Sequence, residues 1–184
     1  NVYLGYSSPK TPTRVYLYNL STKTKKLVKE QEIPSGHNSN NYIVERIEFE
    51  SHDGRLVPLT ITRHKKTKID GTANLLLYGY GSYGSSMSPN FSSTRISLID
   101  RDIIWATAHI RGGMEKGMKW WKEGKLTNKK NTFEDYIFAA KYLINHKYSS
   151  KGKIIGMGGS AGGLLMGAVV NQAPELFLGI IMAV

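Results

Sequence analysis

The sequence of 184 residues contains no cysteine. This absence excludes disulfide bonds, thiolate catalysis and zinc sites built from cysteine ligands. Long hydrophobic runs are also missing: the apolar run at residues 179–184 is far shorter than the roughly 20 residues that span a bilayer, so we expect no membrane partner. A chain without cysteine is compatible with a reducing compartment, and we expect a cytoplasmic location.

Acidic residues are few relative to basic ones: 14 Asp and Glu stand against 25 Lys and Arg, a formal net charge of +11. A basic surface can bind nucleic acid. The lysines, however, fall in short scattered groups and no nucleic-acid motif accompanies them, so we expect solvated surface lysines and no nucleic-acid partner. An apolar share of 40% and a charged share of 21% are typical of globular proteins and exclude wholesale disorder.

Both ends of the sequence are unusual for a complete protein. It begins Asn1-Val2-Tyr3 without an initiator methionine, and it ends in an apolar strand pattern that no polar residue closes. Natural termini are usually solvated. We therefore expect this chain to be an internal piece of a longer protein.

The sequence divides into three segments. Short alternating stretches in residues 1–33 predict a small antiparallel sheet with too few apolar residues to be stable alone. Residues 34–41 are polar and predict a linker. Residues 42–184 begin with two alternating strands, 42–50 and 55–63, around a hairpin turn.

Strands and helices alternate in the rest of residues 42–184. Continuous apolar runs predict strands buried on both faces, which is typical of a parallel sheet; they lie at 73–78, 103–108, 153–156 and 178–184. Apolar spacing predicts a helix from Phe133 to Ile144, preceded by a capping box that starts at Thr132. A second helix, from Ser160 to Asn171, ends before Pro174. This order indicates an α/β fold.

The densest glycine cluster contains Gly158-Gly159-Ser160-Ala161-Gly162, a G-x-S-x-G run between a predicted strand and a predicted helix. In that context the run is typical of a nucleophile elbow, with Ser160 as the nucleophile. The turn strains the serine by about 1–3 kcal/mol. Strand and helix come so close that Gly158 and Gly162 are needed to avoid a clash. The free Ala161 N–H at the helix start points to a developing oxyanion.

The same glycines permit another interpretation. Residues 156–161 match G-x-G-x-x-A, the fingerprint of dinucleotide-binding domains. That motif expects an acidic residue about 20 positions later, at the end of the next strand, and the strand at 178–184 has none. We favour the serine nucleophile and keep the dinucleotide-binding domain as an alternative. An esterase-like α/β-hydrolase is a second alternative.

Two further glycine clusters follow predicted strands. Tyr78 to Gly84 lies where an α/β-hydrolase builds the other half of its oxyanion hole, and the Tyr80 phenol could donate there; the alternative is a turn packed on the core. Arg111 to Glu115 predicts a tight turn with a surface ion pair. The five histidines form no metal-binding spacing. We expect them to be structural or solvated, and we expect no metal or cofactor.

Taken in order, these motifs resemble the prolyl oligopeptidase family of serine peptidases. The resemblance rests on residues 78–84, 110–113, 130–133 and 158–163. Ala161, the Gly-Ser-Tyr-Gly stretch at 81–84 and residues 171–177 are most similar to the oligopeptidase B (protease II) branch. Residues 1–33 are similar to the last β-propeller strands of that branch.

The resemblance implies an α/β-hydrolase domain, here truncated, capped by a β-propeller that admits only short peptides. It implies hydrolysis of peptide bonds by acyl-enzyme chemistry, after Lys or Arg in the oligopeptidase B branch. By motif, Ser160 is the nucleophile, and the Tyr80 hydroxyl and the Ala161 N–H form the oxyanion hole. Tyr83 lines the pocket near the scissile bond.

The catalytic partners of Ser160 are missing from the sequence. The α/β-hydrolase triad runs Ser, then Asp or Glu, then His along the chain. The residues after Ser160 contain no His and no Asp, and Glu175 is the only acid among them. Because a serine hydroxyl without a base is a poor nucleophile, we expect a further segment to complete the triad and the 184 residues alone to be inactive.

Overall fold

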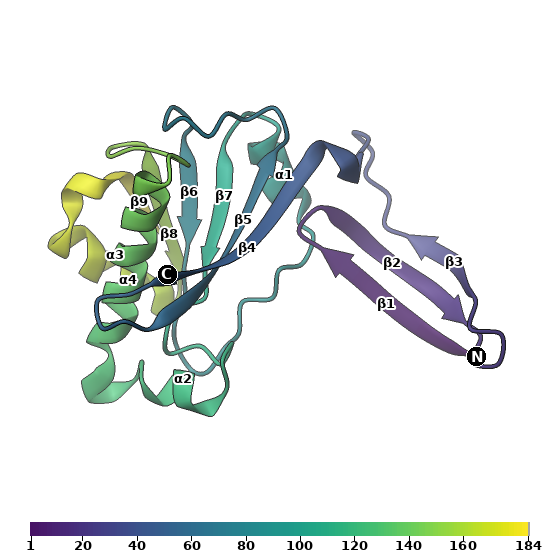
Figure 1. Cartoon of the computed structure of the whole chain (residues 1–184), viewed down its shortest axis with the longest axis horizontal. Coiled ribbons are helices and arrows are strands. Elements are labelled where there is room, and N and C mark those ends of the chain that lie inside the picture. Colours follow the sequence, from purple (N-terminus) through teal and green to yellow (C-terminus); the bar gives the residue numbers. More distant parts are fainter. Residues whose placement is uncertain (184) are drawn as a thin grey trace.

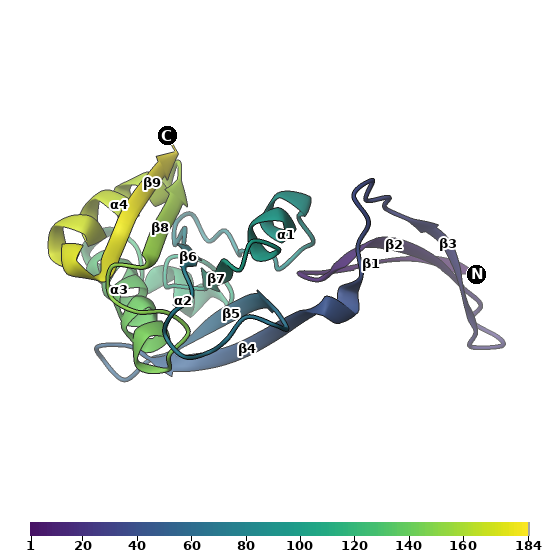
Figure 2. The same ribbon diagram turned by 90° about the horizontal axis from the view of Figure 1, so that it is seen from above.

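The computed structural model describes residues 1–183, which form two sheets joined by residues 31–41 (Figures 1 and 2). Val184, the last residue of the predicted strand 178–184, lies outside the described residues. The fold class is the predicted one: a small antiparallel sheet is followed by an α/β unit with a mostly parallel sheet and flanking helices.

The first sheet is a three-stranded meander that extends away from the larger unit (Figure 1). Its strands pair antiparallel in the order β1-β2-β3, with bounds Val2–Ser8, Thr11–Tyr18 and Lys25–Glu30. Large apolar side chains remain exposed on it, among them Tyr3 at 72%. A sheet with so little buried apolar surface depends on neighbours for its stability.

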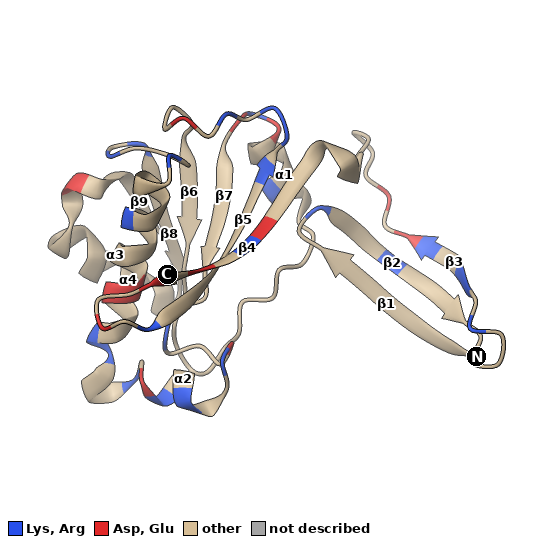
Figure 3. Cartoon of the chain, in the orientation of Figure 1, with Lys and Arg blue, Asp and Glu red and all other residues tan. Residues whose placement is uncertain are grey.

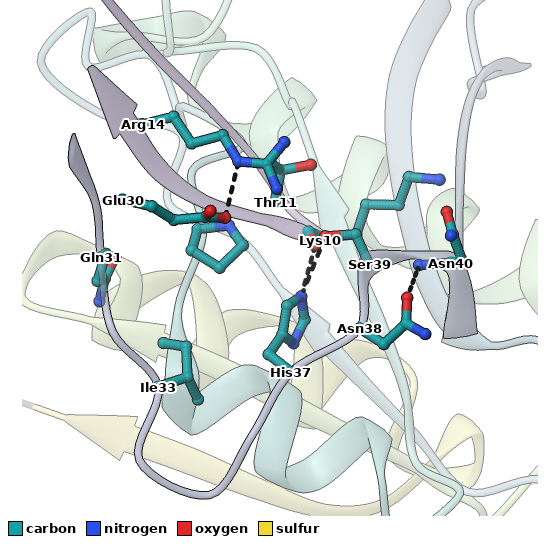
Figure 4. A pocket seen from close by; sticks show the side chains of 11 residues that line it. Lys10, Thr11, Arg14, Glu30, Gln31, Ile33, His37, Asn38, Ser39 and Asn40 are labelled. Carbon is teal, nitrogen blue, oxygen red and sulfur yellow. Dashed lines mark hydrogen bonds and ion pairs between the residues drawn. The ribbon is translucent and has the colours of Figure 1, made fainter. Parts of the chain in front are cut away.

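The turn between β1 and β2 rests on the connecting segment. The His37 ring lies 2.8 Å from the Lys10 carbonyl oxygen and stacks on Tyr42, with ring centroids 5.1 Å apart. The Phe91 N–H donates to the Ser7 hydroxyl. Beside this contact, a polar cavity of about 700 Å³ opens between β2, Glu30 and residues 31–40 (Figure 4). The junction between the two units therefore combines an aromatic stack and a few hydrogen bonds with a polar cavity.

The second sheet has six strands in the order β4-β5-β7-β6-β8-β9. The β4–β5 hairpin and the β5–β7 pair are antiparallel, and the remaining pairs are parallel. The strand bounds are Tyr42–Glu50 (β4), Leu56–His64 (β5), Leu75–Tyr78 (β6), Ile104–Ala108 (β7), Ile154–Gly159 (β8) and Phe177–Ala183 (β9). Parallel strands end at the same edge, so the loops after β6, β7 and β8 meet there.

Helices cover both faces of this sheet. The main core lies between the sheet and helices α3 (Lys130–Asn145) and α4 (Ala161–Gln172), while α1 (Ser93–Ile99) packs on the other face beside Tyr42 and Trp105. The remaining helical segments are α2 (Met118–Lys122) and the 3₁₀ turns η1 (Ser39–Asn41), η2 (Leu126–Asn128) and η3 (Pro174–Leu176). Within residues 1–183, no helix has the length and apolarity needed to cross a membrane.

Two expectations about these elements are wrong. Helix α3 begins at Lys130, and Thr132 is a buried residue inside its first turn rather than a cap. The Thr132 hydroxyl donates to the carbonyl oxygens of Arg111 (2.8 Å) and Gly124 (3.1 Å), so it anchors loops instead of the helix end. Strand β9 is not buried either: within residues 1–183 its pairing partner is β8 alone, and Leu178 and Met182 are 60% and 54% exposed.

The expected surface ion pair at Arg111 is instead a buried ion cluster. The side chain is 1% exposed, and its Nε and Nη2 atoms donate to Asp135 at 2.9 and 2.6 Å. Its Nη1 atom donates to Asp53, and the Ser51 hydroxyl donates to Asp135 at 2.6 Å. The cluster joins the β4–β5 hairpin, the loop after β7 and helix α3. We use the name Arg111 cluster for these four residues.

We expect Arg111→Met to lower the free energy of unfolding by about 3–5 kcal/mol, because the substitution leaves the Asp135 carboxylate buried without its partner. Arg55→Met is the control: Arg55 forms a largely exposed pair with Glu123, and its loss should cost about 1 kcal/mol or less. Urea denaturation of both variants measures the difference. Equal, small losses would contradict a structural role for the Arg111 cluster.

Candidate active site

Ser160 forms the whole turn between β8 and α4. β8 ends at Gly159 and α4 begins at Ala161, and Ser160 has φ +52° and ψ −121°. An L-residue rarely adopts this conformation, and it costs about 1–3 kcal/mol. The Ser160 N–H donates to the Ala183 carbonyl oxygen at 2.6 Å, and the Gly163 N–H donates to the Ser160 carbonyl oxygen at 2.8 Å. These bonds hold the strained turn while Ser160 remains exposed.

Gly158 and Gly162 make this turn sterically possible. A Cβ atom at Gly158 would lie 2.3 Å from the Gly162 carbonyl oxygen, and a Cβ at Gly162 would lie 3.0 Å from the Gly79 carbonyl oxygen. Side chains at either position would push β8, α4 and the loop after β6 apart. Glycine at these two positions therefore allows the close approach of β8, α4 and the loop after β6.

Tyr80 lies against the first turn of α4. A Cβ atom at Gly162 would meet the Tyr80 Cδ2 and Cα atoms at 3.6 and 3.7 Å. The loop after β6 thus brings the Tyr80 backbone and ring next to the helix start that carries the Ala161 N–H. The N–H groups of a helix's first turn lack partners within the helix and can donate to an anion.

The loop around Tyr80 is held in place by two neighbouring segments. A Cβ at Gly112 would lie 2.0 Å from the Gly81 carbonyl oxygen, and the Gly84 N–H donates to the Gly112 carbonyl oxygen at 2.9 Å. From the start of α3, the Lys129 Nζ atom donates to the Gly81 carbonyl oxygen at 2.6 Å and to the Ser82 hydroxyl at 2.8 Å. Burial lowers the pKa of the Lys129 ammonium.

Tyr83 projects from the same loop toward solvent. It is 80% exposed and has φ +55°, another strained backbone for an L-residue. With Ala161 and Leu164 it lines a cavity of about 500 Å³. The four residues predicted to take part in catalysis or substrate binding, Ser160, Tyr80, Ala161 and Tyr83, therefore lie around one edge of the sheet.

Sequence reasoning assigned none of the residues that support this edge to the site. Arg111, Asp135, Thr132 and Lys129 are all bonded to loops near the site. One signal was available: Thr132, Asp135 and Tyr136 lie on the apolar face of a predicted helix, where a polar residue needs a buried partner.

Histidines and other metal-binding types do not gather at this site. His109 is buried at the end of β7, 2.8 Å from the Thr60 hydroxyl and 2.9 Å from Arg46, which is the structural role expected for it. Residues 1–183 contain no group of three or more His, Asp or Glu side chains placed to hold a metal ion. Lys and Arg occur on elements of both units (Figure 3).

A strained serine between a parallel strand and a helix, beside a loop from the neighbouring strand, defines part of an α/β-hydrolase fold. Residues 89–184 match the model of the prolyl oligopeptidase family, and the chain belongs to that family. This membership favours the nucleophile-elbow interpretation of residues 156–162 over the dinucleotide-binding one. β9, the next parallel strand, also carries no acidic residue.

Curated relatives align along almost the whole chain. The chain is 47% identical to dipeptidyl aminopeptidase BI of Pseudoxanthomonas mexicana, over 94% of its length and 24% of that protein. It is 41% identical to Protease 2 of Moraxella lacunata, over 100% of its length and 26% of that protein. The structure of oligopeptidase B from Leishmania major matches 98% of this chain and 25% of its own, with 40% identity and a TM-score of 0.90. The chain therefore spans about a quarter of the length of the relatives it matches.

We expect Gly158→Ala to destabilise the protein by about 1–3 kcal/mol, as overpacking does, because the new methyl group would overlap the Gly162 carbonyl. Gly167→Ala is the matched control, since Gly167 lies within α4 with open space where its Cβ would be. That substitution should stabilise the protein by about 0.5–1 kcal/mol. Thermal or urea unfolding measures the change in the free energy of unfolding for both variants. If both substitutions stabilise the protein, or both destabilise it, the close approach at the elbow is contradicted.

Proposed function

We propose that Ser160 is the nucleophile of a serine peptidase that hydrolyses short peptides through an acyl-enzyme intermediate. The observation that carries this proposal is the Ser160 backbone, whose φ of +52° places the residue alone at the exposed turn between β8 and α4. A strained conformation persists only where the surrounding structure imposes it, and such residues cluster at active sites. Membership of the prolyl oligopeptidase family supports the same reaction.

The reaction that this geometry supports has two steps. The Ser160 Oγ attacks the peptide carbonyl carbon while a base takes its proton, and the carbonyl oxygen becomes an oxyanion. The C–N bond then breaks, the leaving amine takes the proton, and water hydrolyses the acyl-serine ester. We assign oxyanion stabilisation to the Ala161 N–H and the Tyr80 hydroxyl, because Tyr80 packs against the helix turn that carries Ala161.

The proposed reaction needs a base and a carboxylate partner, and the residues after Ser160 include no His, no Asp and a single acid, Glu175. We propose that the base and its partner come from chain outside these 184 residues. The matched relatives are about four times longer than this chain, which leaves room for such a contribution. Residues 1–33 would in this proposal be strands of a β-propeller, and residues 34–41 the connection to the hydrolase domain.

Short peptides are the proposed substrates. Similar solved structures include an oligopeptidase B with covalently bound antipain, and a prolyl oligopeptidase B bound to peptide substrates of 25 and 35 residues. A preference for cleavage after Lys or Arg rests on the resemblance to the oligopeptidase B branch. A panel of peptide and ester substrates assayed with the full-length protein separates this proposal from an esterase function.

We expect a fluorophosphonate to label Ser160 in the full-length protein, because the probe reacts with activated serine hydroxyls. Ser160→Ala should abolish both the labelling and peptide hydrolysis. Peptide mapping of the labelled protein identifies the modified residue. Labelling of a different serine, unaffected by Ser160→Ala, would refute the assignment.

We expect Tyr80→Phe to lower kcat by about 10²–10³-fold with little change in KM, the usual loss when one oxyanion donor is removed. Tyr78→Phe is the matched control: it also removes one phenol hydroxyl, but Tyr78 lines a separate cavity with Trp105 and Met157. Steady-state kinetics on one peptide measures both variants. An unchanged kcat in a folded Tyr80→Phe variant would return Tyr80 to a packing role.

A further inference from the structure

Three exposed apolar side chains converge next to Ser160. Among residues 42–183, the three most exposed large apolar side chains are Leu126, Tyr83 and Leu164, at 82%, 80% and 63%. They come from η2, the loop after β6 and α4, yet all three line the same cavity of about 500 Å³. Exposed apolar surface gathered around a concavity is typical of a binding site. We use the name Tyr83–Leu126 cavity for it.

The backbone holds two of these side chains in strained conformations. Tyr83 has φ +55° and Leu126 has φ +51°. Each is followed by a fixed turn: the Gly84 N–H donates to the Gly112 carbonyl oxygen, and the Lys129 N–H donates to the Leu126 carbonyl oxygen at 3.1 Å. Positive φ also occurs at Lys23, Asp102 and Lys147, but strained residues are enriched at ligand-binding sites. Here the strained backbone keeps a tyrosine and a leucine exposed beside the cavity.

The charged side chains that line the Tyr83–Leu126 cavity are all basic. Lys125 and Lys129 line it, and no acidic residue among those described does. The Lys125 Nζ atom lies 3.6 Å from the centroid of the Trp121 ring, which keeps the ammonium at the cavity wall. The Lys129 Nζ atom uses two donors on Gly81 and Ser82, which leaves the third N–H of an ammonium.

The cavity adjoins the proposed catalytic centre, because Ala161 forms part of its wall and follows Ser160 directly. Resting on the proposed function, we propose that the Tyr83–Leu126 cavity is a substrate subsite for an apolar side chain together with an adjacent carboxylate of the same peptide. The carboxylate is that of an Asp or Glu residue or the free C-terminus. The two ammonium groups exclude Lys and Arg from this subsite, so a basic side chain would bind on another side of Ser160.

Internally quenched peptides test this subsite in the full-length protein. Each peptide carries a Leu beside one variable residue, which is Glu, Gln or Lys. This pair is moved through three positions on either side of the scissile bond, and mass spectrometry locates the cleavage. At one position we expect kcat/KM to fall about tenfold from Glu to Gln, with a further fall for Lys, because a charged hydrogen bond is lost and then replaced by repulsion. Peptides with an acidic or amidated C-terminus distinguish a terminal carboxylate from a side-chain one.

Variants of Lys125 connect the preference to the cavity. Lys125→Met should reduce the Glu-over-Lys ratio about tenfold, and Lys125→Glu should invert it. Lys130→Glu is the matched control, since it makes the same charge change at an exposed residue that does not line the cavity. It should keep the wild-type ratio. Leu126→Ser should lower kcat/KM for the Leu peptides relative to Gly peptides, and its high exposure makes unfolding an implausible cause.

Fluorophosphonate labelling of Ser160 distinguishes a failure of the proposed subsite from a failure of the proposed function. Equal labelling of all variants, with a Glu-over-Lys ratio that Lys125→Met and Lys125→Glu leave unchanged, would overturn the subsite while the proposed function stands. A wild-type protein that is neither labelled at Ser160 nor active on any peptide would overturn the proposed function, and the subsite with it. Equal labelling with a ratio lost in Lys125→Met and kept in Lys130→Glu supports both.

Discussion

Direct backbone contact between glycines is the constraint on which the rest of the structure depends. A Cβ atom at Gly158 would overlap the Gly162 carbonyl, and one at Gly112 would overlap the Gly81 carbonyl; a Cβ at Gly162 would crowd the Gly79 carbonyl oxygen at 3.0 Å. Through these contacts β8, α4 and the loops after β6 and β7 approach more closely than side chains allow. Ser160, Ala161 and Tyr80 are neighbours of these glycines in sequence, so their relative positions follow from the same contacts.

The Arg111 cluster anchors the loop after β7, which takes part in these contacts through Gly112. Arg111 precedes Gly112, and its buried guanidinium is bonded to Asp135 on α3 and to Asp53 at the β4–β5 hairpin. A buried ion pair gains little net free energy over apolar packing, because both groups lose their hydration. Its effect here is orientation: it fixes the loop after β7, whose Gly112 packs against Gly81, and so fixes the loop that carries Tyr80.

The sequence predicts the local features well and the long-range ones poorly. The turn at Ser160, helix α4 and the succession of strands and helices along the chain follow from glycine spacing and hydrophobic period, which are properties of neighbouring residues. The partners of Arg111 lie 58 and 24 positions away, at Asp53 and Asp135, and no periodicity connects them. For the same reason Thr132 resembles a cap although its hydroxyl serves distant carbonyls. An apolar run such as 178–184 indicates a strand but does not indicate whether its faces are covered.

A crystal structure of the full-length protein with a peptide aldehyde bound tests the central claim most directly. The account predicts a covalent bond from the Ser160 Oγ to the aldehyde carbon. It also predicts the resulting oxygen at about 2.7–3.1 Å from both the Tyr80 hydroxyl and the Ala161 nitrogen, the usual range for oxyanion donors. An adduct on another residue, or an oxygen that points away from both donors, would contradict the proposed active site.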